Sequence, residues 1–206
     1  LVILACNTAS AKALRTIQQK DLPLIAPNNR VLGVIRPSTE VLGERTKTGH
    51  VGVLGTIGTI ASQSFPIELS KFAPDTVVHQ HACPMWVPLI ENQQHEHPAG
   101  QQFIYEDVQA ILAQSSEIDT LLLACTHYPV LQQQIEMLVG PTIQVVPQGP
   151  IVAEKLESYL FAHPEMEARL SKNGSVAYFT SEATAVFNER AKSFLGDQVN
   201  SVHHSF

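Results

Sequence analysis

Residues 121–129 read Leu-Leu-Leu-Ala-Cys-Thr-His-Tyr-Pro, an apolar run that leads directly into a cysteine and two polar residues. A short run of this kind predicts a strand buried on both faces of a parallel sheet. Pro129 suits the first turn of a helix, where the missing N–H is tolerated. We therefore expect Cys125 at a strand-to-helix junction, where the helix dipole should lower the pKa of its thiol and favour the thiolate.

The beginning of the chain has the same form. Residues 1–5 predict an apolar strand, Cys6 follows it, and Asn7 and Thr8 are residue types that cap helices. The two cysteines lie 119 positions apart (125 minus 6) in equivalent turns. The repetition predicts a fold that brings the two thiols face to face.

Short strands alternate with helices of roughly 10–16 residues along the chain, which predicts an α/β fold with mainly parallel sheets flanked by helices. About eight strands exceed the number that one compact sheet of this size needs. We therefore expect two similar lobes with the active site between them, at the carboxyl ends of the strands. The first lobe would comprise residues 1–30 plus 140–206 and the second residues 31–139, and the stretches 21–29 and 163–174 are expected to be connections.

The composition is that of an ordinary globular protein: 206 residues, 44% hydrophobic, 16% charged and a formal net charge of −6. The negative charge disfavours a nucleic-acid partner. No apolar run reaches the ~20 residues of a membrane helix, and no signal peptide precedes the first strand. Two of the three cysteines end apolar strands, which fits a reducing cytoplasm better than a disulfide framework.

The chain begins at Leu1, inside what reads as a core strand and without an initiator Met. A parallel core strand needs neighbours on both sides. We therefore expect that an amino-terminal segment is missing from this chain.

Polar residues at the two cysteine turns could bind a ligand. Asn7, Thr8, Thr126 and His127 offer donors at helix starts, where carboxylates bind readily, although plain helix capping explains the same residues. The turn at 55–59 contains Thr59 but lacks the lysine of a phosphate-binding loop. It is either a hydroxyl-lined turn that contacts a small ligand or an ordinary tight turn.

His79, His81 and Cys83 alternate along one strand face, and these residue types are zinc ligands. Strong zinc signatures pair two ligand sets across a longer loop, and no second set is evident. We favour a structural role for these residues and expect no metal. No lysine stands out as a Schiff-base candidate, so a pyridoxal cofactor is not indicated.

Taken together, these motifs resemble glutamate racemase, of the aspartate/glutamate racemase superfamily, over essentially the whole chain. The two cysteine turns, in this order and spacing, carry most of the resemblance. The matching stretches are residues 5–10, 52–59, 82–84, 87–89, 125–129 and 178–181.

The resemblance implies a cofactor-independent isomerase that interconverts L- and D-glutamate by proton transfer at Cα. Its product would supply peptidoglycan, and so cell-wall biogenesis and cell shape, from a cytoplasmic enzyme that could be a homodimer. The implied acid/base residues are Cys6, acting on D-glutamate, and Cys125, acting on L-glutamate, with His127 assisting and Glu91 as a further acidic residue. The implied substrate-binding residues are Asn7, Thr8, Thr59, Thr126 and His127.

The chain departs from the family pattern at two places. The family's amino-terminal Asp-Ser-Gly segment, which assists the first cysteine, and a Tyr-Gly pair are absent, so we expect the chain as given to be inactive by itself. Residues 147–149 read Pro-Gln-Gly where the family usually shows Asp-Ser-Gly, a change expected to lie away from the chemistry. Three alternatives stay open: a racemase for aspartate or another amino acid, a non-catalytic ligand-binding remnant, and a redox or zinc protein that uses Cys83.

Overall fold

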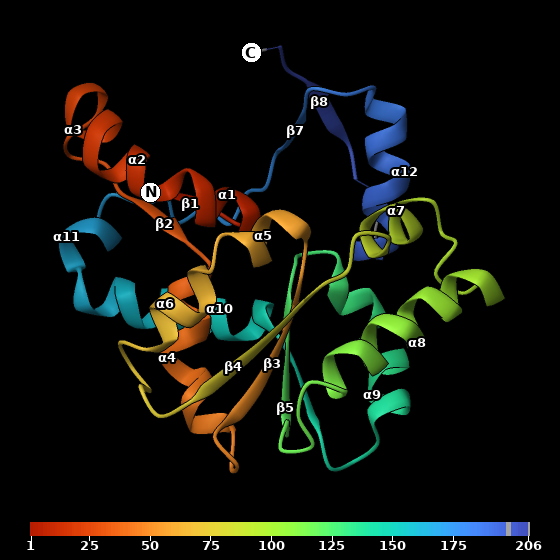
Figure 1. The fold of residues 1–206 in the computed structure, drawn as a ribbon. Helices are drawn as coiled ribbons and strands as arrows, with labels where there is room; N and C mark the ends of the chain where they lie inside the picture. The colour runs from red at the N-terminus through yellow and green to blue at the C-terminus, as the bar shows by residue number, and fades with distance from the viewer. Residues whose placement is uncertain (197–198, 206) are drawn as a thin grey trace. The chain divides into compact units, whose positions relative to one another are not determined.

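The computed structural model describes residues 1–196 and 199–205 (Figure 1). The chain forms two compact units, residues 1–168 and residues 169–206. Within the described residues, each strand pairing is parallel, as expected for a chain in which strands and helices alternate.

The centre of the first unit is a four-stranded sheet with the order β4-β3-β5-β6. Its third strand is the stretch that the sequence marks most clearly, and all five of its residues are buried. The apolar sequence and the burial agree, because a strand with neighbours on both sides and helices on both faces has no exposed side. The strands are β3 (His50–Gly55), β4 (Val77–Ala82), β5 (Thr120–Ala124) and β6 (Gln144–Pro147).

Helices cover both faces of this sheet (Figure 1). Leu121 and Leu123 point into an apolar cluster with Trp86, Ile104 and Tyr128, while the alternate residues of β5 point into a second cluster on the opposite face. The helices of the first cluster are α7 (Trp86–Glu91), α8 (Pro98–Leu112), η2 (Tyr128–Leu131) and α9 (Gln132–Val139). Those of the second are α4 (Ile35–Arg45), α5 (Ile57–Ala61), α6 (Ser64–Leu69) and α10 (Gln148–Ala162).

The first strand is not the buried core strand that the sequence predicts. Strand β1 (Val2–Leu4) pairs with β2 (Val31–Gly33), its one strand neighbour among the described residues. Val2 is 51% exposed and Ile3 38%, because a two-stranded sheet leaves an edge and part of a face uncovered. The residues between these strands are largely helical, in α1 (Asn7–Lys12), α2 (Leu14–Thr16), the π-helix η1 (Ile17–Asp21) and α3 (Leu22–Ile25).

The connections expected at 21–29 and 163–174 both contain helical residues, and a third stretch breaks its helix at one residue. The connection expected at 21–29 contains α3, whose Pro23 stands in the first turn, where proline is tolerated. After the turn at 55–59, the helical backbone is divided at Gln63, whose φ of 55° interrupts it between α5 and α6. The loop expected at 163–174 begins with the short helix α11 (Pro164–Glu167).

The second unit contains β7 (Tyr178–Thr180), α12 (Thr184–Leu195) and β8 (Ser201–His203), and its two strands pair in parallel. This strand, helix and strand continue the alternation that the sequence predicts along the chain. In the described part of both units, no helix is long and apolar enough to cross a membrane.

Candidate active site

Cys125 lies where the sequence predicts, directly after β5 and ahead of η2. Its side chain is 9% exposed, and its Sγ is 4.0 Å from Nδ1 of His127. The other ring nitrogen of His127, Nε2, is 3.1 Å from Oε1 of Glu91, the last residue of α7. The fold therefore connects a thiol, an imidazole and a carboxylate by two successive contacts, although the three residues come from two separate parts of the chain.

The electrostatics of Cys125 differ from the expectation. Burial raises the pKa of its thiol, the backbone N–H of His127 lowers it, and the nearby Cys6 raises it. The backbone N–H groups of Tyr128 and Thr126 also lower the pKa, but the net shift is upward. The predicted lowering is wrong because loss of water around a charged sulfur outweighs the donors at the helix start. Cys125 therefore needs a base to become a thiolate near neutral pH.

Cys6 follows β1 and is the N-cap residue of α1. Its side chain is exposed, in contrast to Cys125. The two thiols lie close enough within the first unit for a charge on Cys6 to act on Cys125. The sequence predicted that Asn7 and Thr8 would cap α1. Instead, both residues stand inside its first turn, and neither caps it.

Asn7 is part of a buried polar chain that the sequence does not reveal. Its side chain is 2% exposed, and its Nδ2 donates a hydrogen bond of 2.6 Å to Oε1 of Gln148. Gln148 in turn donates through Nε2 to Oγ of Ser38, at 2.8 Å. The change to Pro-Gln-Gly at 147–149 therefore contacts a candidate site residue. The other amide atom of Asn7, Oδ1, is buried and has no hydrogen-bond partner among the described residues.

Thr8 and Thr59 also meet. The Thr8 hydroxyl lies 3.2 Å from the Thr59 hydroxyl and 2.8 Å from the Thr56 hydroxyl. The hydroxyls of Thr56 and Thr59 are 3.1 Å apart. Thr56 caps α5, since its Oγ1 accepts from the backbone N–H of Thr59. The turn at 55–59 is thus lined with hydroxyls that face α1. Thr126, by contrast, is exposed and meets Cys125 through its backbone N–H.

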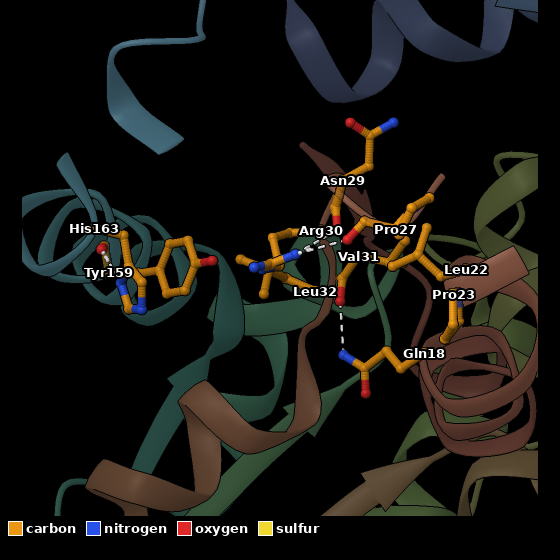
Figure 2. A pocket seen from close by; sticks show the side chains of 10 residues that line it. All are labelled: Gln18, Leu22, Pro23, Pro27, Asn29, Arg30, Val31, Leu32, Tyr159 and His163. Atoms are coloured by element: carbon orange, nitrogen blue, oxygen red, sulfur yellow. Dashed lines mark hydrogen bonds between the residues drawn. The ribbon is translucent and has the colours of Figure 1, made fainter. Parts of the chain in front are cut away.

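A cavity of about 480 Å³ in the first unit is lined by none of these candidate residues. Figure 2 shows the side chains that line it, and those of Gln18 and Arg30 already donate to backbone carbonyl groups. Gln18 donates to the carbonyl oxygen of Val31 at 2.7 Å, and Arg30 donates to that of Asn29 at 2.9 Å. Tyr159 and His163 stack on each other on the opposite wall. This cavity brings together no nucleophile, acid or base that the sequence singled out.

Comparison with known proteins shows which family the chain resembles along its length. No family profile matches it. It is 32% identical over 204 residues to a glutamate racemase of Streptococcus suis, an alignment that covers 98% of this chain and 74% of the relative. The crystal structure of a glutamate racemase isoform from Bacillus anthracis is 29% identical with a TM-score of 0.86, covering 99% of this chain and 73% of that one.

A third comparison shows the fold alone. The glutamate racemase of Francisella tularensis, solved in complex with D-glutamate, is 23% identical, with a TM-score of 0.79 over 99% of this chain and 72% of that one. The α/β fold with parallel sheets flanked by helices, expected from the sequence, is thereby confirmed. By its similarity to relatives over almost all of its length, the chain belongs to the glutamate racemase family.

Proposed function

We propose that this chain interconverts L- and D-glutamate without a cofactor, by moving protons between Cα of the substrate and the thiols of Cys6 and Cys125. The observation that supports it best is the connection from Cys125 through His127 to Glu91, with contacts of 4.0 Å and 3.1 Å. A buried thiol with its own imidazole and carboxylate is suited to proton transfer. Glutamate is proposed as the substrate because the relatives are glutamate racemases, one of them solved with D-glutamate.

In the direction from L- to D-glutamate, the Cys125 thiolate takes the α-proton, and the Cys6 thiol gives its proton to the opposite face of Cα. The reaction begins with one thiolate and one thiol, and it ends with the two roles exchanged. The reverse reaction begins from the Cys6 thiolate. Two bases on opposite faces allow inversion without turning the substrate over.

His127 would supply the base that the Cys125 thiol needs, and Glu91 would support that base with a carboxylate. Because burial raises the pKa of that thiol, the thiolate must be formed by transfer of its proton to a nearby base. The imidazole of His127 is the nearest candidate, and the Glu91 carboxylate would stabilise the imidazolium that results. Once formed, a thiolate shielded from water is a stronger base towards a carbon acid than an exposed one.

The remaining candidate residues would bind glutamate and stabilise the negative charge that develops at Cα. The unpartnered Oδ1 of Asn7 can accept a hydrogen bond from the substrate ammonium group. The hydroxyls of Thr8 and Thr59 can donate to a carboxylate, and the exposed Thr126 offers a further hydroxyl donor. D-Glutamate formed in this way would serve peptidoglycan synthesis.

The test is racemisation by the protein expressed from its complete reading frame, with no added pyridoxal phosphate. Circular dichroism of L-glutamate should decay to zero as the two enantiomers equalise, and the decay should persist with a chelator present. L-Aspartate in a parallel cuvette should change much more slowly. Decay that requires pyridoxal phosphate, or that occurs with aspartate and not with glutamate, would contradict the proposal.

A further inference from the structure

Three side chains outside the proposed proton relay form a compact group of metal-binding donors. They are His81, Cys83 and Asp107, and one ligand atom of each lies within 4.8 Å of the other two. Nε2 of His81 is 2.8 Å from Oδ1 of Asp107. A nitrogen, a sulfur and an oxygen donor thus converge on one point, from residues that the proposed reaction does not use.

The fold holds this group in place from several sides. His81 stands on β4, and Cys83 follows the end of that strand. The backbone N–H of Cys83 donates to the Gly55 carbonyl oxygen at 2.9 Å, and the Tyr128 hydroxyl donates to the Cys83 carbonyl oxygen at 3.1 Å. Asp107 comes from α8, which packs along β4. The donors therefore sit on a strand end and a long helix, so the group is preorganised.

The structure completes a ligand set that the sequence left incomplete. His79 belongs to a different pair: its ring stacks on that of His50, and His50 Nδ1 lies 3.1 Å from His79 Nε2. Asp107 takes the place of the missing ligand, 24 positions after Cys83 (107 minus 83). No local spacing rule could have paired these two residues, because the contact is made by packing of a helix on a strand.

The donor set matches zinc-class ions. Zinc binds thiolate sulfur, imidazole nitrogen and carboxylate oxygen at about 2.0–2.3 Å, which corresponds to donor separations of roughly 3.3–3.7 Å in a tetrahedral site. The present separations, up to 4.8 Å, require a closing of about 1 Å that side-chain rotations can supply. The side chains of His81 and Asp107 are 26% and 19% exposed, so an ion can enter from solvent.

We propose that His81, Cys83 and Asp107 bind one zinc-class divalent cation, with a fourth position left for water. The proposal goes beyond the racemase reaction, which needs no metal. The site would tie the end of β4 to α8 just ahead of α7, the helix that carries Glu91. Occupancy would therefore stiffen the segment that positions the carboxylate of the proposed proton relay.

The test uses Co²⁺ as a spectroscopic probe with the full-length protein stripped of metal by a chelator. We expect one Co²⁺ per chain, with a thiolate-to-cobalt charge-transfer band that disappears when Zn²⁺ is added. Cys83→Ser should abolish the band. His81→Gln and Asp107→Asn should each weaken Co²⁺ binding at least ~100-fold, since loss of even an outer-shell partner can cost 10–100-fold. Glu106→Gln, the exposed neighbour of Asp107 on α8, is the matched control and should bind Co²⁺ as the parent does.

Other outcomes would overturn the proposal. A band that survives Cys83→Ser but disappears in Cys6→Ser or Cys125→Ser would mean that the reaction thiols bind the cobalt. Absence of a thiolate-to-cobalt band in the parent protein would also overturn the proposal. If the Cys83→Ser protein does not fold, the Asp107→Asn protein provides the test. A Co²⁺ affinity of Asp107→Asn equal to that of Glu106→Gln would overturn the proposed site. None of these readouts depends on racemase activity, so the site and the proposed function stand or fall separately.

Discussion

Oε1 of Glu91 lies 3.1 Å from Nε2 of His127, although the two residues are 36 positions apart in the chain. The carboxylate fixes the imidazole from behind, while Nδ1 of the same ring faces Sγ of Cys125 at 4.0 Å. A ring held at both nitrogens has little freedom to turn away. The contact gives Glu91 a specific role as a residue that positions His127.

Glu91→Gln should slow racemisation by about 10²-fold, at the lower end of what an acid/base partner contributes. Because the equilibrium constant between enantiomers is one, kcat/KM should fall equally in both directions. The pH at which activity rises should also move upward, since Cys125 loses support for removal of its proton. Rates by circular dichroism across pH 6–10 measure both effects. Glu96→Gln, an exposed carboxylate, is the control, and a Glu91→Gln profile identical to it would refute the role.

Gln148→Met should lower the free energy of unfolding by about 1–3 kcal/mol. The substitution keeps the side-chain volume but leaves the buried Nδ2 of Asn7 and Oγ of Ser38 without their present partner. Urea unfolding of the variant, beside Gln133→Met at an exposed position, measures the difference. Equal midpoints for the two variants would show that the buried amide pair contributes nothing to stability.

Asp119 should make the protein sensitive to acid. Partial burial raises the pKa of its carboxyl, but hydrogen bonds from Thr46, the backbone of Lys47 and Thr48, and Thr120 outweigh this and lower the pKa to about 2. A pKa below the unfolded value of ~3.9 means that the stabilisation is present above that value and is lost as pH falls towards the folded pKa.

Asp119→Asn should therefore destabilise the protein by about 1–2 kcal/mol at pH 7, after allowance for solvent screening, and by much less near pH 2. Urea unfolding at several pH values between 2 and 7 measures the change. Asp75→Asn, an exposed loop carboxylate, is the matched control. A loss of unfolding free energy in Asp119→Asn that stays constant with pH would contradict the lowered pKa of Asp119.

Gly58→Ala should impair substrate binding and leave the fold intact. A Cβ at this position would lie 2.9 Å from Cγ2 of Thr8, so that side chain must move away from the hydroxyls of Thr56 and Thr59. The position is helical, where alanine is favoured over glycine by up to about 1 kcal/mol, so stability should not fall.

The expected kinetic result for Gly58→Ala is a KM for glutamate raised several-fold with a smaller change in kcat. Gly149→Ala is the comparison, since a Cβ there meets nothing within 4 Å. An unchanged KM in a folded Gly58→Ala protein would argue against a role for the threonine cluster in binding.

The sequence predicted β5 and the position of Cys125 because an apolar strand between two covered faces leaves a local signature. It did not predict the direction of the Cys125 pKa shift, which depends on burial by residues far along the chain. Gln148 was missed for a similar reason, since its partner Asn7 is 141 positions away. The two lobes at 1–30 plus 140–206 and at 31–139, and the homodimer, stay predictions.

The central claim is that two thiols act on opposite faces of Cα, and α-proton exchange in D₂O tests it most directly. Cys6→Ser and Cys125→Ser should each nearly abolish racemisation, because a serine hydroxyl is a far poorer base than a thiolate. Each variant should nonetheless exchange the α-proton of one enantiomer by its remaining thiol. Cys6→Ser should incorporate deuterium into L-glutamate alone, and Cys125→Ser into D-glutamate alone, as followed by NMR. Racemisation near the parental rate in either variant, or the same enantiomer labelled by both, would contradict the account.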